Sequence, residues 1–554
     1  MSSQTRIILC VLILSQLTSF LLYANTIKGS FVYDDHLFAE RAELAEPRVL
    51  LSVWSQPYVP GRANLGVWRP LTTASFALNF IIFGNSPVSF HVVSIVLNGL
   101  VVWLVFLLIL ELARDWKLAA LTAFVFAVLP IHTQAVAYIK SRDELLAALF
   151  ILPGWLLYLR QRILPSAIFV FFAMLAKEQA IAAPLLFLAV DWVRQKNWKN
   201  LLPKIKYFVL FMAIYLGARF AILKEYAFGR DDMYTSSNPL RDAPSLTALG
   251  TGFKIAFVYI SKTFIPKGFS ATYAYNHLPL VTNMFLSWQT ILGLIILAVL
   301  VYLALARRFR GGALSIGATI FLVSYALISK FIFRDAGEMV EEHWMYFPSL
   351  GLALLAAVLL QQLITQRKIL GGTALSVVAL WYGASTIERN PVWLNDRAFF
   401  EAMVRDAPNS IPGHLNMAII YYNENNFALA KQAADRAAAI DPNNPNLLQF
   451  LGSYELALGN LERAKDYLQK SFSIRSDFLE SRELYALALS KQRRYQECLD
   501  FIAPFLPGRE RNLRLRYIMA LCYYKLGRKD AAQAFFDWDP QKSEQEKIQF
   551  LENW

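Results

Sequence analysis

Long apolar runs fill the first 393 residues of this 554-residue chain, and they constrain its fold more than any other feature. About 20 apolar residues in a helix cross the hydrocarbon core of a bilayer. The chain is 56% hydrophobic and only 17% charged, which excludes a simple soluble enzyme and a disordered protein. We interpret as membrane spans the runs 7–24, 91–112, 118–136, 144–160, 163–176, 180–193, 207–223, 288–306, 313–331, 345–363 and 368–386.

Lysine and arginine placement predicts the orientation of these spans. Short basic loops stay on the cytoplasmic side, and the candidates here are Arg194–Lys206, Arg307–Arg310 and Arg367-Lys368. We treat 251–266 as a surface or re-entrant helix, because a crossing there would place Arg307–Arg310 outside. About eleven crossings result, with the N-terminus inside and everything after residue 387 outside.

After Trp393 a repeat of 34 residues replaces the apolar runs. Small residues recur at two positions of the repeat: Ala418, Gly452, Ala486 and Ala520 at the first, and Ala430, Ala464, Cys498 and Ala532 at the second. This period is typical of tetratricopeptide repeats (TPRs), whose paired helices approach closely at small side chains. Cys498 is expected to be a buried free thiol. We therefore predict an all-α protein: a polytopic helical bundle in 1–393, with an outer first loop over 25–90, and a TPR α-solenoid in 394–554.

Two adjacent carboxylates, Asp34 and Asp35, follow the first span directly. Ionisable groups are costly beside a membrane and often functional, so one of them is a candidate general base. In an extended segment neighbouring side chains point oppositely, and only one would then face a reacting centre. Two alternatives stay open: a solvated helix cap, and a metal site that includes His36, for which one short cluster is a weak signal.

Further charged groups gather on the same predicted outer side. Singly, each is expected to be an interfacial anchor or a local ion pair. Together, arginine and lysine can hold a phosphate while the neighbouring carboxylates transfer protons. The groups are Arg69, Ser141–Glu144, Lys177-Glu178, Arg219 and Glu341–Tyr346.

Six motifs occur in order along the chain: FVYDDH, VWRPLTTASFALNFIIFGNSPVSFHVVSIVLN, AYIKSRDELLAALF, LAKEQAI, EEHWMYFPSLG and RNPVWLNDRAFFEAMVRDAPNSIPGHLNMA. Together they resemble the transmembrane and tetratricopeptide-repeat (TMTC) O-mannosyltransferase family. The resemblance implies a type C glycosyltransferase fold and a polyprenyl-monophosphate sugar as donor. This chain departs from the family at Ser141, where glycine is usual, and at His343, where arginine is usual. The second change replaces a permanent cation by a side chain that is neutral near pH 7.

The resemblance also implies roles for single residues. Asp34 or Asp35 would be the base, with Asp34 favoured, and the anomeric configuration would invert. Cations would neutralise the lipid phosphate, and no metal or other cofactor would be needed. The implied phosphate ligands are Arg142, Lys177 and Arg219, then Arg69 and His343, while Glu178, Glu342 and Tyr273 would position the site.

These motifs predict a membrane glycosyltransferase. It would move one sugar, mannose or another hexose, to a protein hydroxyl presented by the TPR domain. A lipid or polysaccharide acceptor and a non-enzymatic TPR scaffold are the alternatives. The short repeat tail favours a bacterial inner membrane with the site facing the periplasm; a eukaryotic chain would lie in the endoplasmic reticulum. No nucleic acid partner is expected.

Overall fold

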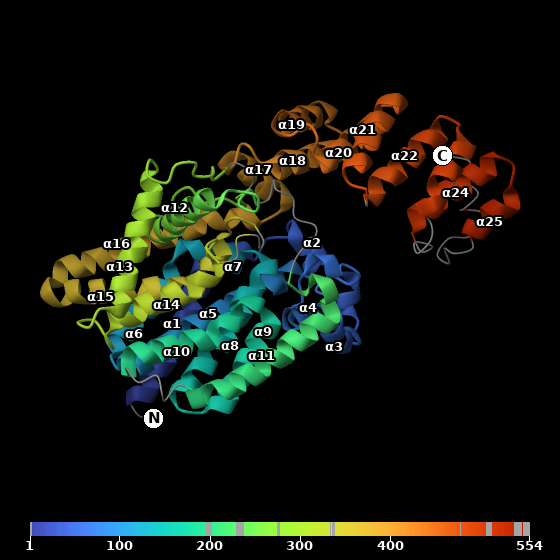
Figure 1. Cartoon of the computed structure of the whole chain (residues 1–554). Helices are drawn as coiled ribbons and strands as arrows, with labels where there is room; N and C mark the ends of the chain where they lie inside the picture. Colours follow the sequence, from blue (N-terminus) through green and yellow to red (C-terminus); the bar gives the residue numbers. More distant parts are fainter. Residues whose placement is uncertain are drawn as a thin grey trace. The chain divides into compact units, whose positions relative to one another are not determined.

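The computed structural model describes residues 3–195, 202–228, 238–273, 277–332, 334, 338–476, 478–505, 512–536 and 546. Helices account for all regular secondary structure in this part of the chain, which contains no strand. The chain divides into two compact units, Met1–Pro408 and Asn409–Trp554, and Figure 1 shows the helices of each. Part of the predicted cytoplasmic segment Arg194–Lys206, residues 196–201, lies outside the described residues.

Every apolar run predicted to span the membrane overlaps a helix of the first unit. Among the residues that the structure describes, six helices are long and apolar enough to cross, or seven if the bent pair Trp116–Ala137 forms one span, so the predicted number of crossings is not confirmed. The apolar helices are α1 (Ser3–Tyr23), α5 (Pro87–Ala113), α6 (Trp116–Val128), α7 (Thr133–Ala137), α8 (Arg142–Leu159), α9 (Ile163–Ala176), α10 (Ala183–Gln195), α11 (Leu202–Leu223), α13 (Trp288–Leu305), α14 (Ala313–Ile328), α15 (Ser349–Gln366) and α16 (Lys368–Arg389).

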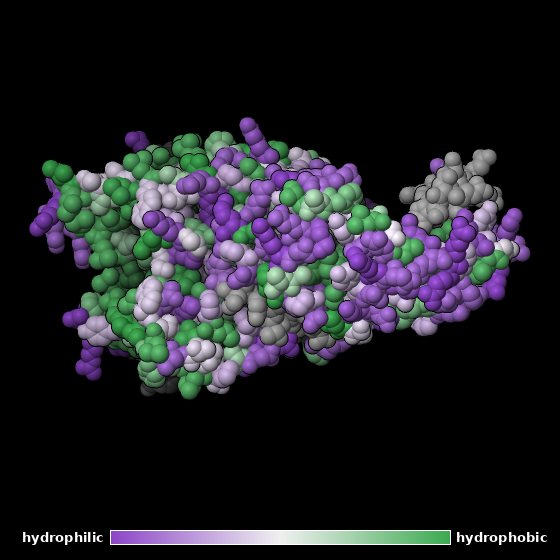
Figure 2. Space-filling view, turned by 90° about the horizontal axis from the view of Figure 1, so that it is seen from above, coloured by the Kyte–Doolittle hydropathy of each residue, from purple (hydrophilic) through white to green (hydrophobic). Residues whose placement is uncertain are grey.

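The packing of this unit is typical of a membrane bundle, with small residues between helices and apolar side chains outside. A Cβ added to Gly351 of α15 would lie 2.5 Å from the Gly317 carbonyl of α14, so only glycine lets these helices approach so closely. Leu14, Ile295 and Leu380 are among the large apolar side chains that stay exposed. Exposed side chains of this kind fit contact with lipid. Figure 2 shows hydrophobic surface, coloured green, on one face of the molecule. This is a membrane protein.

The predicted spans 163–176 and 180–193 are two helices that meet at a polar apex, Lys177-Glu178. Helix α9 ends at Ala176, Lys177 is extended, and a short 3₁₀ turn over Glu178–Ala182 leads into α10. Helix α12 (Ser245–Phe264) occupies the stretch predicted as a surface or re-entrant helix.

The first loop folds as a small layer with its own core. It contains the helices α2 (Asp34–Phe38), α3 (Val49–Ser52) and α4 (Pro70–Phe83). Phe38, Tyr58 and Phe76 belong to this core, which also includes Phe90 of α5. Helix α17 (Asp396–Asp406) belongs to the first unit as well, so that unit ends at Pro408, later than the predicted boundary at Trp393.

The second unit is a series of helical hairpins with the predicted repeat. Its helices are α18 (Ile411–Asn423), α19 (Phe427–Ile440), α20 (Pro445–Ala457), α21 (Leu461–Ile474), α22 (Leu479–Lys491), α23 (Tyr495–Ile502), α24 (Leu513–Lys525) and α25 (Lys529–Phe536). The small residues at both repeat positions are buried. A Cβ on Gly452 would meet Leu468 at 2.5 Å, which explains why a small residue recurs there. Cys498 is free and buried, as predicted.

Candidate active site

The two adjacent aspartates at the start of α2 have different surroundings. Asp35 is buried: its Oδ1 accepts a hydrogen bond from the Lys140 amide at 2.7 Å, and its Oδ2 accepts one from the Val32 amide at 3.0 Å. Asp34 is 31% exposed, and its Oδ2 lies 3.2 Å from Lys140 Nζ. The pair opens a helix, so the expected extended segment is wrong, but the side chains do separate into a locked one and an accessible one.

Burial acts strongly on Asp35. It raises the pKa of this carboxyl to about 8, although the two amide hydrogen bonds oppose the shift. A group that is protonated near neutral pH and fully engaged with backbone amides fits a structural role in the loop. Asp34 is the member of the pair with a side-chain face open to an incoming hydroxyl.

A buried ion-pair cluster brings together Arg69, Asp143, Glu144, Lys177 and Glu178. Arg69 donates to both oxygens of Glu178, from Nε at 2.9 Å and from Nη2 at 2.5 Å, and it also pairs with Asp143. Lys177 Nζ lies 2.6 Å from Glu144 Oε1 and 3.3 Å from Asp143 Oδ1. Burial alone would raise the pKa of Glu178, but the Arg69 guanidinium holds it below its ordinary value. Each predicted cation of this cluster therefore already has carboxylate partners.

Arg142 lies apart from this cluster, although it was expected to bind phosphate. Its guanidinium is fully buried between the rings of Phe76 and Phe90, at 4.9 and 5.0 Å. It donates to Asn79 Oδ1 and the Phe90 carbonyl, each at 3.0 Å, and to the Ser75 carbonyl at 3.3 Å. These contacts tie the first loop to α5, and the geometry fits a structural anchor rather than a phosphate ligand.

Arg219 also binds carbonyl groups. Its Nη2 donates to the Gly66 carbonyl at 2.6 Å and its Nε to the Ala227 carbonyl at 2.8 Å. Its positive charge also contributes to the low pKa of Glu178. In this arrangement Arg219 fastens the first loop beside the ion-pair cluster.

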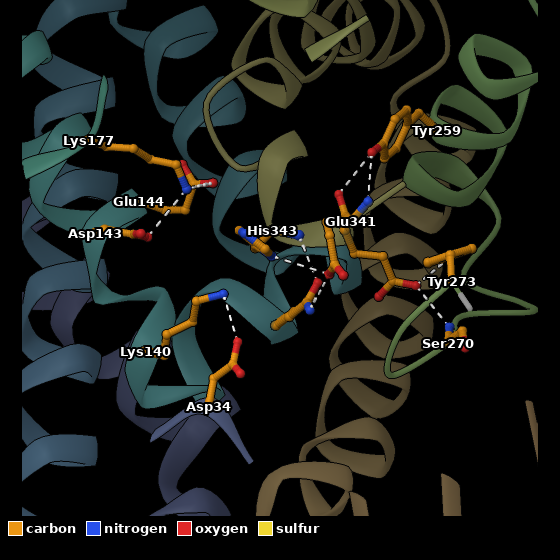
Figure 3. Close-up of polar contacts among 12 residues, drawn as sticks. Asp34, Lys140, Asp143, Glu144, Lys177, Tyr259, Ser270, Tyr273, Glu341 and His343 are labelled. Carbon is orange, nitrogen blue, oxygen red and sulfur yellow. Dashed lines mark hydrogen bonds and ion pairs between the residues drawn. The ribbon is translucent and has the colours of Figure 1, made fainter. Parts of the chain in front are cut away.

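The segment Glu341–Tyr346 supplies a second polar group. Glu342 accepts hydrogen bonds from Tyr273 Oη at 2.6 Å, from the Ser270 amide at 3.0 Å and from Arg389 Nη2 at 2.5 Å. The structure thus brings Glu342 and Tyr273 together, and its cationic partner is Arg389 of α16 rather than any cation in the predicted set. Figure 3 shows Tyr273 and Ser270 around this segment.

His343 lies between the ion-pair cluster and Glu341 in Figure 3. Burial, together with the nearby charges of Lys177, Lys140 and Arg69, holds the pKa of His343 well below its ordinary value. The imidazole is therefore neutral at pH 7 and adds no positive charge for a phosphate. Glu341 shows the opposite shift: burial raises its pKa to about 8, with Glu338 acting in the same direction.

An apolar groove borders the ion-pair cluster. Lys177 and Glu144 line it together with residues of α8, α10, α14 and the segment just before α15. Its cavity volume is about 50 Å³, and it is partly open to the outside. Its apolar walls include Ala147, Ala148, Ile151, Ala180, Ala183, Leu186, Leu327, Ile328 and Phe347.

Among the described residues, no three potential metal ligands gather at one point. His36, the third member of the Asp34–Asp35–His36 run, instead contacts Glu40 and Asp396, at 2.5 and 2.9 Å. The expectation that no metal is needed stays a prediction.

Known proteins resemble this chain in both of its parts. The human protein O-mannosyl-transferase TMTC3 is 26% identical over 494 residues, which cover 80% of this chain and 52% of the relative. The Drosophila melanogaster protein O-mannosyl-transferase Tmtc1 is 33% identical over 181 residues, covering 30% and 21% of the two chains. This chain is similar to the TMTC proteins over most of its length. It spans about half the length of the relatives that match over most of it.

The repeat unit has matches of its own. A family model described as anaphase-promoting complex, cyclosome, subunit 3 matches residues 423–505. The crystal structure of MamA matches with a TM-score of 0.23 and 16% identity, covering 28% of this chain and 89% of that chain. The first of these matches agrees with the TPR hairpins described above.

The sequence did not predict two charged residues that the structure places at the site. Lys140 pairs with Asp34, and Arg389 pairs with Glu342. Both stand inside quoted motifs, AYIKSRDE and RNPVW, so the TMTC resemblance marked their segments without indicating their partners. Only the fold shows that these distant segments meet.

Proposed function

We propose that this chain is a membrane glycosyltransferase that moves one sugar, mannose or another hexose, from a polyprenyl-phosphate carrier to a protein hydroxyl. The names of its TMTC relatives support sugar transfer to protein as the reaction class. The observation that carries the assignment is the different surroundings of the Asp pair, because they leave one accessible carboxylate, Asp34, beside the Lys140 ammonium.

In this mechanism Asp34 is the general base. Its carboxylate takes the proton of the acceptor hydroxyl as that oxygen bonds to the anomeric carbon. The bond from the anomeric carbon to the phosphate oxygen breaks, and polyprenyl monophosphate leaves with the electron pair. Attack from the side opposite the phosphate inverts the anomeric configuration. Lys140 Nζ lies 3.2 Å from Asp34 Oδ2 and orients the carboxylate.

The leaving phosphate requires compensation of its growing negative charge. Lys177 is the first candidate, because its ammonium both belongs to the ion-pair cluster and lines the apolar groove. Arg69 is the second candidate, since it lies in the same cluster. Buried cations stabilise a developing anion more than they would in water. We propose that the carrier's apolar chain occupies the groove and that no metal takes part.

The proposed acceptor is a protein bound through the TPR unit, because helical hairpin repeats commonly form peptide-binding surfaces. We place the site and the repeats on the outer side of the membrane, as the basic loops predict. That side is the periplasm if the chain is bacterial, with the spans in the inner membrane, and the lumen of the endoplasmic reticulum if it is eukaryotic.

The test compares Asp34→Asn with Asp35→Asn and with a matched control. Glu46→Gln is the control, because it removes a carboxylate from the same loop that pairs only with exposed Arg48. We expect Asp34→Asn to lower transfer by about 10²–10⁴-fold without loss of thermal stability. Asp35→Asn should destabilise the protein, since its amide nitrogen cannot accept from the Lys140 or Val32 amides. Full activity of Asp34→Asn would remove the proposed base.

The acceptor is identified by mass spectrometry of proteins from the source organism, with and without the gene. Loss of a hexose from specific Ser or Thr peptides is the expected result. An altered glycolipid or polysaccharide with unchanged peptides would retain sugar transfer and reject the protein acceptor. No change in either would favour the scaffold alternative.

A further inference from the structure

Tyr33, directly before the proposed base, has a strained backbone. Its φ is 50° and its ψ is −108°, a conformation that a bulky residue with a Cβ rarely adopts. Such a conformation persists only where surrounding contacts hold it. Tyr33 determines how α2 begins and therefore where Asp34 points.

The contacts that hold Tyr33 come from α17, more than 360 residues further along the chain. The Tyr33 amide donates to Asp396 Oδ1 at 2.8 Å. The Tyr33 ring stacks on Phe399, with centroids 5.4 Å apart and planes at 23°, and meets Phe400 edge-on at 5.6 Å. Just upstream, the Ser30 amide donates to the Leu394 carbonyl at 2.8 Å.

Asp396 also contacts His36, which follows the proposed base Asp34 by two residues. Its Oδ2 lies 2.9 Å from His36 Nε2, while His36 Nδ1 lies 2.5 Å from Glu40. One carboxylate therefore contacts residues 33 and 36, and Asp34 stands between them. Asp396 is the first residue of α17, and the Asn395 side chain caps that helix by accepting from the Ala398 amide at 2.9 Å.

We propose that Asp396 is a positioning residue for sugar transfer, acting through Tyr33 and His36 to hold the Asp34 carboxylate at the site. The proposal rests on the proposed function of Asp34 as base. It gives the segment 394–400 a role in catalysis distinct from its place just before the repeats. Neither Asp396 nor Tyr33 needs to touch the donor or the acceptor for this role.

The experiment uses the full chain in lipid nanodiscs, with short-chain polyprenyl-phosphate mannose as the donor probe. The acceptor is the unmodified form of the peptide that the mass-spectrometric comparison identifies as hexosylated. Asp396→Ala should lower kcat by about 10–100-fold, the effect expected of a base displaced by about 1 Å. The KM for the donor should change by less than about threefold, because no proposed donor contact is removed. Asp396→Asn keeps one oxygen for the Tyr33 amide, so its kcat should lie between those of Asp396→Ala and the wild type.

Hydrogen exchange tests the hydrogen bond between the Tyr33 amide and Asp396 without any substrate. The amide of Tyr33 should exchange at least tenfold faster in Asp396→Ala, since it loses its acceptor. Glu401→Gln is the matched control: it removes a carboxylate from the same helix whose exposed partner is Arg397, and it should leave both kcat and exchange unchanged. If Asp396→Ala does not fold, His36→Gln, which removes one of the two Asp396 contacts, should show a smaller kcat loss with unchanged KM.

These outcomes distinguish the positioning role of Asp396 from the proposed role of Asp34 as base. Wild-type kcat in Asp396→Ala, or a loss that lies in the donor KM alone, would overturn the positioning role. An unchanged exchange rate at the Tyr33 amide would overturn the inference that Asp396 holds the Tyr33 backbone. Full activity of Asp34→Asn would instead overturn the base, and the exchange experiment would still decide whether Asp396 holds the loop.

Discussion

Arg142 has two candidate roles, as a phosphate ligand and as a buried structural anchor, and replacing it by methionine distinguishes them. As a phosphate ligand, Arg142 would act on donor binding. As a buried anchor, it would act on the stability of the first loop. Methionine keeps much of the side-chain volume and removes every hydrogen-bond donor of the guanidinium, so it tests the anchor with little added cavity.

The contacts of Arg142 set the size of the effect. Its loss leaves the Asn79 amide oxygen and the Phe90 and Ser75 carbonyls without this donor. Each buried acceptor left unpaired costs about 1–3 kcal/mol, and such costs do not add fully. The two flanking rings also lose a cation at about 5 Å. We therefore expect Arg142→Met to lower the stability of the first unit by about 3–5 kcal/mol.

Thermal unfolding in nanodiscs, together with transfer kinetics on the folded fraction, decides between the roles. The anchor predicts a clear fall in Tm and a donor KM within about threefold of the wild type. Lys177→Met is the comparison, because it should raise the donor KM. A variant Arg142→Met with unchanged Tm and a strongly raised donor KM would refute the structural role and restore the original prediction.

Two further predictions concern other parts of the chain. Asp35 keeps its proton up to about pH 8 when folded but loses it near pH 4 when unfolded, so its contribution to stability is present below pH 4 and is lost as the pH rises to 8. The Tm should therefore fall across this window, less steeply in Asp35→Asn, and a Tm that rises with pH would contradict the shift. In the repeat unit, the sulfurs of buried Cys498 and Cys522 lie 2.8 Å apart on α23 and α24. A mild thiol oxidant should link them within one chain, as a mass loss of two hydrogens will show; failure to link would contradict this packing.

The helices of this protein could be predicted from sequence because hydropathy and a fixed repeat are local properties. The apex at Lys177-Glu178 is an example, since two charges interrupt an apolar run too long for one helix. The small residue at Gly452 is another, because close helix packing requires it in every repeat. The number of crossings does not follow from hydropathy alone, because apolar helices such as α9 and α14 are shorter than a typical membrane span.

The site could be predicted only as a set of motifs. Arg142 and Lys177 looked equivalent as cations at helix ends, yet one is enclosed by Phe76 and Phe90 and the other lies by a groove. Partners such as Lys140 for Asp34, or Asp396 for Tyr33, depend on contacts between distant segments. No periodicity in the chain encodes those contacts, so a single sequence does not reveal them.

The ion-pair cluster raises a final question about donor binding, because its cations are already paired. Lys177 lies between Glu144 and Asp143, with 2% of its side chain exposed. A phosphate that approaches this ammonium meets two carboxylates as well. Glu144→Gln removes one of those carboxyl groups while keeping the side-chain shape, so the surroundings of Lys177 become more positive wherever Glu144 is ionised.

If Lys177 is the cation for the donor phosphate, Glu144→Gln should lower the donor KM by about 3–30-fold, or about 0.6–2 kcal/mol. Glu111→Gln is the matched control, since it removes a carboxylate from a pair with Arg160, whose side chain is 62% exposed, and should leave the KM unchanged. An unchanged or raised KM in Glu144→Gln would mean that this ammonium does not meet the phosphate. Arg69, which Glu178 holds through two hydrogen bonds, would then become the cation to test.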